Sequence, residues 1–296
     1  MEYNNVYVNG SSFSYGYGLD KKEFLQTLNK FNEKYPNYNL KQSELNEFRE
    51  SNCWPGVLQN ILNKKVVNES LYGGSFSRVM RMTFDYINSQ ENPKKTFYIL
   101  EVPNYDRYDL FSVQQNRFIK ASSPEVSDEE VVGMEFNAIK QFYTCFSDWI
   151  VAWRREVMNL LFFSNYLKSL NLNFIIIPTE QFLLTQQLNQ NSDKLSHWSN
   201  RIFDNSVQNS LKDIDLNIIK FPTKSNPYGN LYDNSKFTPY KNYTNNLLVY
   251  SDESENFMFN EETDNILNDR HFTLSGNKQI AKQVFNYMEY YKSVTI

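Results

Sequence analysis

Short apolar runs alternate with segments of helical periodicity through the first hundred residues of the chain. Runs of β-branched and aromatic residues that end at turn residues predict buried strands, and apolar residues spaced three or four apart predict helices. Together they predict a parallel α/β sheet. Strands are expected at 6–8, 65–68 and 97–102, and helices at 19–35, 54–62 and 77–88, with a polar connection over 37–51.

A long helical pattern follows, from about Ser127 to Leu170. Ser127 and the acidic residues after it predict an amino-terminal cap. Asn173–Ile177 then predicts another buried strand. The stripe of large side chains along the helical region is more typical of a core or a subunit interface than of a ligand site. It comprises Phe142, Phe146, Trp149, Trp153, Leu160 and Phe163.

The last hundred residues are less regular. Candidate strands lie at 216–221 and 247–250, separated by Pro222–Asn246, which is rich in Pro, Gly and Asn and is interpreted as an irregular loop or lid. A final helix is expected from about Ser275 to Tyr291. Because Pro222–Asn246 is interpreted as a loop and not as a linker between domains, the chain is expected to form one domain. That domain covers 1–296, with a helical insertion near 122–170 and the irregular loop or lid near 222–265.

Composition narrows the classes of function. The net charge of -4 argues against a general nucleic-acid binder, which needs a basic face. The apolar stretches are shorter than the roughly 20 residues of a spanning helix, and the first residues do not have the pattern of a signal peptide. We therefore expect no membrane attachment, and a cytoplasmic or virion-associated protein. Two cysteines and two histidines, far apart, predict free thiols and no zinc site; they are Cys53, Cys145, His197 and His271.

A possible catalytic set lies at the two ends of the chain. Ser12 follows the first strand, and Asp269 and His271 precede the last helix. In an open α/β sheet, the loops that follow the strands converge on one edge. A serine, a base close to it and a group that orients the base are the requirements of nucleophilic catalysis. Ser12 alone is equally compatible with a simple strand-to-helix turn.

Three blocks of sequence occur in a characteristic order. They are Gly10-Ser11-Ser12-Phe13-Ser14-Tyr15-Gly16, then Asn68-Glu69-Ser70-Leu71-Tyr72-Gly73-Gly74-Ser75 with Arg78 and Arg81 after it, and finally Asp269-Arg270-His271 through Gly276. In order and spacing these blocks resemble the SGNH (GDSL-like) hydrolase superfamily, in particular the branch whose first block is of the Gly-Cys-Ser-Phe-Thr-Tyr-Gly type. The residues between about 120 and 265 carry no part of the resemblance.

The resemblance implies a flavodoxin-like three-layer α/β/α fold with a central parallel five-stranded sheet. It also implies a serine esterase that hydrolyses small acyl esters, such as acetyl esters of a carbohydrate, without a metal or organic cofactor. Ser12, His271 and Asp269 would form the catalytic triad. The backbone N–H groups of Ser12 and Gly73, together with Asn104, would form the oxyanion hole.

Three positions depart from the branch. Pro103, which has neither an N–H nor a side-chain donor, stands where an oxyanion donor is expected, with Asn104 next to it. Phe76 stands where the branch often has Asn, and Asn277 where it often has His. The departures leave open an alternative: a catalytically weak or inactive SGNH-fold subunit, structural or glycan-binding, of a larger assembly such as a virus particle.

The expected partners follow from these two hypotheses. An esterase would bind a small ester or an acylated glycan, and Arg78 and Arg107 are candidate substrate contacts. A structural subunit would use the aromatic helix 142–163 to bind a second copy or an assembly partner.

Overall fold

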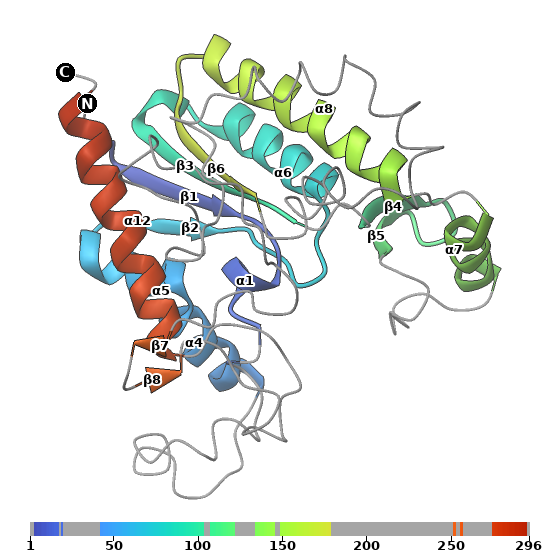
Figure 1. The fold of residues 1–296 in the computed structure, drawn as a ribbon, viewed down its shortest axis with the longest axis horizontal. Coiled ribbons are helices and arrows are strands. Elements are labelled where there is room, and N and C mark those ends of the chain that lie inside the picture. Colours follow the sequence, from blue (N-terminus) through green and yellow to red (C-terminus); the bar gives the residue numbers. More distant parts are fainter. Residues whose placement is uncertain are drawn as a thin grey trace, which may run out of the picture.

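The computed structural model describes residues 3–17, 19, 42–103, 107–121, 134–145, 149–178, 251–252, 255–256 and 274–294. Its centre is a parallel sheet with the strand order β2-β1-β3-β6 (Figure 1). The four strands are β1 (Asn5–Asn9), β2 (Val66–Asn68), β3 (Thr96–Val102) and β6 (Asn173–Pro178). These four strands and their parallel arrangement confirm the sequence prediction. A fifth strand stays a prediction, because both candidate segments lie outside the described residues.

Helices cover both faces of this sheet. Successive side chains of a strand point to opposite faces, so Tyr7 packs in one core and Val6 and Val8 pack in the other. Both faces of β1 and β3 are apolar because both are covered. One face is covered by α6 (Phe76–Ser89) and α8 (Trp149–Ser169), and the other by α5 (Trp54–Leu62) and α12 (Leu274–Val294) (Figure 1). The layers are therefore helix, sheet and helix, and the helices predicted near 54–62, 77–88 and 275–291 are confirmed.

The prediction of a polar connection over 37–51 is wrong for residues 42–51, which are helical. They belong to helix α4 (Gln42–Asn52), with only Leu45 and Arg49 buried. Near its end, Ser51 Oγ and Asn52 Nδ2 donate to carbonyl oxygens one turn earlier, at 2.8 Å each. Two buried positions are too few to produce a visible apolar stripe, so the periodicity that identifies a helix was absent from the sequence.

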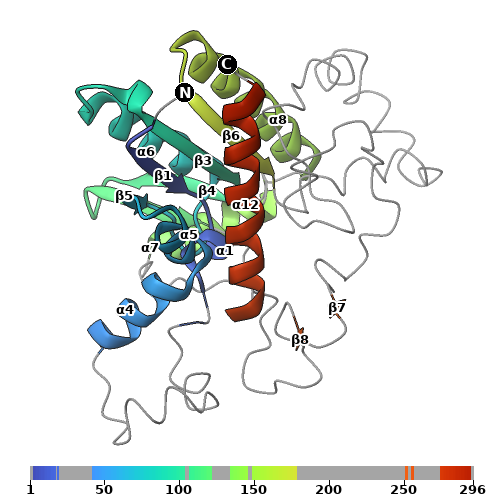
Figure 2. The ribbon, with the colours of Figure 1, turned by 90° about the vertical axis from the view of Figure 1, so that its left-hand side faces the viewer.

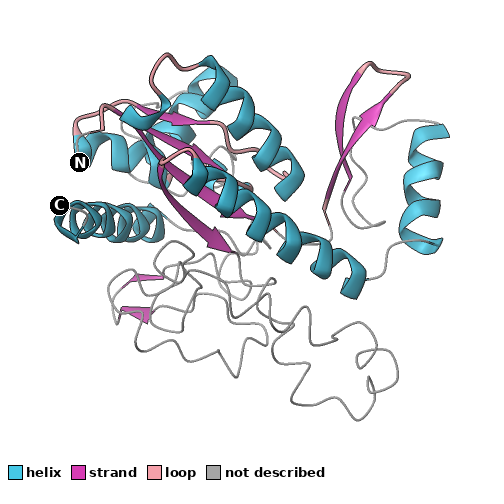
Figure 3. Ribbon diagram, turned by 90° about the horizontal axis from the view of Figure 1, so that it is seen from above, coloured by secondary structure: helices cyan, strands magenta, loops and turns pink. Residues whose placement is uncertain are grey.

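Residues 108–121, for which the sequence predicted no element, form an antiparallel hairpin. Its strands are β4 (Tyr108–Ser112) and β5 (Arg117–Ala121), and Asn116 adopts a left-handed φ of 49° in the turn. The hairpin and α7 (Met134–Cys145) lie to one side of the layered core (Figure 3). The predicted long helix is thus represented by two described helices, α7 and α8.

The remaining described elements are short. They are α1 (Ser12–Tyr15), the 3-10 turn η1 (Pro93–Lys95), β7 (Ser251–Asp252) and β8 (Glu255–Asn256). Most of the helix expected at 19–35, the cap at Ser127 and most of the predicted lid lie outside the described residues. None of the described helices has the combination of length and apolar character needed to cross a membrane.

The first turn of α12 is joined to the first turn of α5. The fully buried Asn277 accepts a hydrogen bond through Oδ1 from the backbone N–H of Trp54, at 2.8 Å. That N–H has no partner within α5 because it belongs to the first turn. Cys53, one residue earlier, lies against Gly16 at the end of α1. A Cβ atom added to Gly16 would be only 2.5 Å from Cys53 Cβ. Figures 1 and 2 show α12 running past α5 and then along the sheet.

Asn277→Ala should destabilise the fold. The variant leaves the buried Trp54 N–H without its acceptor, which typically costs about 1–3 kcal/mol. Urea denaturation, followed by far-UV circular dichroism, measures the free energy of unfolding. The neighbouring exposed Lys278→Ala is the control and should change this free energy by less than about 0.5 kcal/mol. Equal midpoints for Asn277→Ala and the wild type would contradict the role given to this hydrogen bond.

Cys53 should resist alkylation in the folded protein. Burial raises the pKa of its thiol to about 11, although the nearby Arg49 opposes the shift. Because the thiolate is the reactive form, about one thiol in a thousand is ionised at pH 8, and the sulfur is also shielded from reagent. Iodoacetamide treatment followed by peptide mapping should find Cys53 unmodified in buffer and modified in urea. Equal rates in both conditions would contradict this environment.

Candidate active site

The first block forms a strand–turn–helix at the carboxyl end of β1. Ser11 is the N-cap of α1 and Ser12 is its first residue, with 2% of its surface exposed. The backbone N–H groups of Tyr15 and Gly16 donate to the carbonyl oxygens of Ser11 and Ser12 at 2.9 and 3.0 Å. Gly16 then ends the helix with a left-handed φ of 80°. Ser12 is thus held at the end of the central strand, where the sequence analysis expected a nucleophile.

The second block packs against the first. Leu71 N donates to the carbonyl oxygen of Gly10 at 3.1 Å, and Gly74 N donates to Leu71 O at 2.9 Å. A Cβ on Gly74 would lie 3.3 Å from Gly10 O, so the two backbones are in close contact. Gly73 between them has a φ of 70°, a region that favours glycine. The structure therefore brings together two blocks that are about 60 residues apart in the sequence.

Two backbone N–H groups where the first and second blocks meet have no acceptor among the described residues. Within the described part of the chain, no group accepts a hydrogen bond from the N–H of Ser12 or of Gly73. Unpaired backbone N–H groups beside a nucleophile are the usual components of an oxyanion hole. This is the role that the resemblance implies for both residues.

Glu101, which the sequence analysis did not select, lies directly under the Ser12 loop. It is 2% exposed, and its Oε2 accepts hydrogen bonds from Ser14 N at 3.1 Å and Ser14 Oγ at 2.5 Å. Its Oε1 accepts a hydrogen bond from Ser11 Oγ. A single acidic residue within the apolar run of β3 was the signal that could have identified it.

The hairpin reaches the second block through Lys120. Its Nζ donates to Tyr72 O at 3.2 Å and lies 5.2 Å from the centre of the Tyr72 ring. A Cβ on Gly73 would be 3.6 Å from Lys120 Cδ. On the other side, the rings of Tyr72 and Tyr17 stack at 4.2 Å. Lys120 therefore packs beside Gly73 and Tyr72, and Tyr17 stacks on Tyr72; no motif in the sequence indicated these contacts.

The two candidate substrate arginines have different surroundings. Arg78 Nη1 donates to Asn9 Oδ1 at 3.3 Å and to Glu69 O at 3.0 Å, and burial lowers the pKa of this guanidinium. Arg107 precedes β4, and its Nη1 is buried without a hydrogen-bond partner among the described residues. Of the two, Arg107 has the unused donor.

The other predicted site residues lie outside the described residues. These are Asp269, His271 and Asn104. Pro103, beside Asn104, is buried directly after β3. The catalytic triad and the third oxyanion donor therefore stay predictions.

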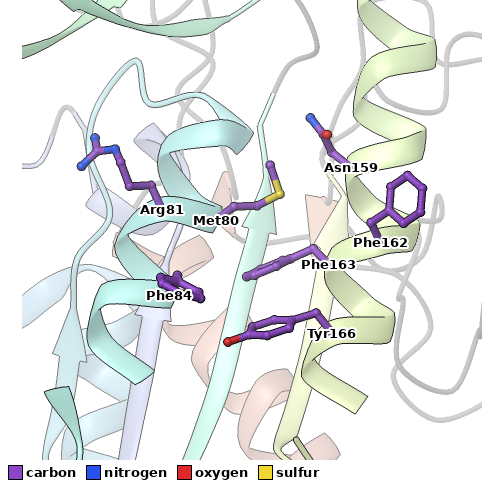
Figure 4. A pocket seen from close by; sticks show the side chains of 7 residues that line it. All are labelled: Met80, Arg81, Phe84, Asn159, Phe162, Phe163 and Tyr166. Atoms are coloured by element: carbon purple, nitrogen blue, oxygen red, sulfur yellow. The ribbon is translucent and has the colours of Figure 1, made fainter. Parts of the chain in front are cut away.

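A concavity lies between α6 and α8, with a volume of about 390 Å³ (Figure 4). Phe84 and Phe162 on its rim are 47% and 68% exposed. Below it, the buried Phe76 packs edge-on against Phe163, with ring centres 6.1 Å apart. Phe76 is therefore a core residue between α6 and α8. The groove is lined by Met80, Arg81, Phe84, Asn159, Phe162, Phe163 and Tyr166.

Comparisons with known proteins find few similarities. No curated protein matches the chain. A solved structure described as that of a "putative lipolytic protein of G-D-S-L family from Desulfitobacterium hafniense DCB-2" is 12% identical, with a TM-score of 0.37, over 96% of this chain and 99% of that one. A similarity at this level establishes neither a shared fold nor a shared activity. Residues 34–113, which include the second block, match a family described as a family of unknown function (DUF6071).

Proposed function

We propose that the chain is a serine esterase of the SGNH type that hydrolyses small acyl esters. The observation that carries this proposal is the packing of the Ser12 turn against the Gly73 loop, with both backbone N–H groups unpaired in the described residues. A nucleophile and two oxyanion donors at the carboxyl edge of a parallel sheet are the core of an acyl-transfer site.

The proposed reaction is acyl transfer to water. His271 removes the proton from Ser12 Oγ, which attacks the ester carbonyl, and Asp269 orients the imidazole. The negative charge that develops on the carbonyl oxygen is stabilised by the N–H groups of Ser12 and Gly73, with Asn104 as a third donor. His271 then gives its proton to the departing alcohol, and water, activated by the same base, releases the acyl group from Ser12.

The start of α12 supports the placement of His271 near Ser12. The helix begins at Leu274, three residues after His271 in the sequence. Its first turn is bonded to Trp54, whose neighbour Cys53 touches the end of α1. The first turn of α12, which follows His271 in the sequence, is therefore linked through the start of α5 to the end of the nucleophile's helix.

The strand order supports the finer description of the fold. β2-β1-β3-β6 corresponds to the first four strands of the flavodoxin-like order, which continues with a fifth strand beyond the fourth. We propose that one of the segments 216–221 and 247–250 supplies this strand.

The surroundings of Gly73 favour a carbohydrate ester as the substrate. The stacked Tyr17 and Tyr72 give the rim of the site an aromatic surface, a common partner of sugar rings, and Lys120 adds a donor. Arg107, with its unused buried donor, is the proposed contact for a polar group of the substrate.

Ser12→Ala should abolish ester hydrolysis, because it removes the attacking oxygen. The expected loss of kcat is at least about 1000-fold on p-nitrophenyl acetate and on acetylated oligosaccharides, and His271→Ala should cause a similar loss. The control is Ser89→Ala, at an exposed serine that ends α6, which should retain wild-type rates. A wild type that hydrolyses none of these esters, or that is matched by Ser12→Ala, would contradict the proposal.

A second candidate function is favoured by the exposed aromatic groove and by the buried Pro103. In this alternative the chain is a structural subunit, and the groove between α6 and α8 binds a second copy of the chain. An exposed apolar patch of this kind on a folded domain commonly marks an interaction surface. Phe162 would be its principal contact, because it is the most exposed aromatic residue lining the groove.

In that case Phe162→Asp should dissociate a wild-type oligomer. Loss of a central aromatic contact typically weakens an interface by about 2 kcal/mol or more, so the dissociation constant should rise at least about 30-fold. Sedimentation velocity across a concentration series measures it. Val113→Asp, in the hairpin turn and 86% exposed, is the matched control and should leave the oligomer intact. A monomeric wild type at all concentrations would refute this alternative.

A further inference from the structure

We infer that Glu101 is the positioning residue of the proposed active site, clamping the turn that carries Ser12 from both sides. The effect of Glu101 on catalysis rests on the proposed function, whereas its effect on the turn does not. Ser11 and Ser14 flank Ser12 and its neighbour Phe13, and both donate to the one carboxylate. Glu101 therefore acts on the reaction through these two serines and not through contact with the ester.

The hydrogen bonds of Glu101 are concentrated on this turn. A buried carboxylate is costly unless its oxygens are hydrogen-bonded. Its three donors are Ser11 Oγ, Ser14 Oγ and Ser14 N, and among the described residues no lysine or arginine forms an ion pair with it. Among the described residues, the Ser12 turn supplies all the hydrogen bonds that compensate the burial of Glu101, so turn and carboxylate depend on each other.

Gly10 provides independent support. A Cβ on Gly10 would lie 2.6 Å from Glu101 Cβ and 2.7 Å from Glu101 Oε2. Any side chain at this position would displace the carboxylate from its place under the turn. The φ of Gly10 does not lie in the left-handed region, so backbone conformation does not require a glycine here. The close approach of Glu101 does.

A second tether holds the same turn from β2. Asn68 Nδ2 donates to the carbonyl oxygen of Ser14 at 3.0 Å, while its Oδ1 accepts from Ser70 N at 3.1 Å. Ser14 is thus fixed to β3 through Glu101 and to the second block through Asn68. The position of Ser12 relative to Gly73 follows from both tethers.

Glu101→Gln should lower kcat while KM stays within about twofold of the wild type. The amide has a single acceptor oxygen, so either the Ser11 hydroxyl must change from donor to acceptor or the Ser14 N–H must lose its acceptor, and both change the turn. A small displacement of a reacting group typically costs about 10- to 100-fold in rate. Glu91→Gln, at an exposed glutamate, is the matched control and should change neither constant.

Hydrogen exchange provides a readout that does not depend on activity. The amides of Tyr15 and Gly16, which close α1, should exchange at least about 10-fold faster in Glu101→Gln, while those of β1 keep their protection. The double variant Ser11→Ala/Ser14→Ala keeps Glu101 but removes the two hydroxyl donors. It should loosen the same amides, and adding Glu101→Gln to it should have less effect than in the wild type.

The outcomes separate this inference from the proposed function. A wild type without esterase activity refutes the proposed function. The hydrogen-exchange rates of the α1 amides then still show whether Glu101 holds the turn. Wild-type exchange rates and kcat in a folded Glu101→Gln variant would overturn the inference. If that variant does not fold, the same result in Ser11→Ala/Ser14→Ala overturns it equally.

Discussion

The position of β1 between β2 and β3 is the constraint on which the rest of the structure depends. Val8 pairs with Asn68 on one side and with Ile99 on the other, so the three strands end at nearly the same level. Burial of both faces holds this register, because a slip by one residue would move every side chain to the opposite face. As a result, segments widely separated in the sequence continue from one edge of the sheet, and the Ser12 turn meets the Gly73 loop there.

Polar contacts then fix the helices to this edge. Asn9, fully buried at the end of β1, donates through Nδ2 to Tyr7 Oη at 3.0 Å and to the carbonyl oxygen of Val79 at 3.1 Å. Its Oδ1 accepts from Arg78, which also binds Glu69 O. Burial raises the pKa of the Tyr7 hydroxyl, so it remains a neutral partner in this network. Helix α6 is therefore bound directly to the strand that precedes the candidate nucleophile.

The sequence predicted those parts of the fold whose apolar pattern is dense. The four parallel strands and the helices α5, α6 and α12 belong to this class, since each presents a continuous apolar face to the sheet. Helix α4 was missed because it buries only Leu45 and Arg49, and the β4–β5 hairpin because neither a strand alternation nor its turn was recognised.

Within the candidate site, sequence reasoning selected the residues that carry family motifs and missed those that act through the fold. Ser12 and Gly73 stand in recognisable blocks, and the structure brings their loops together. Glu101 and Lys120 have no motif, and their relation to Ser11 and Gly73 depends on contacts between distant segments. Such residues can be identified only from the three-dimensional structure, in which the ends of the strands lie side by side.

Pro103 restricts how the proposed oxyanion hole can be built. The pairing of β3 with β6 ends at Val102 and Pro178, and Pro103 offers no N–H beyond it. In the proposed site, the backbone N–H groups of Ser12 and Gly73 would then provide much of the stabilisation. Such donors are effective only if they are held in place before the charge develops. The contacts of Gly10 with the second block meet this requirement, because they fix the two loops to each other through the backbone.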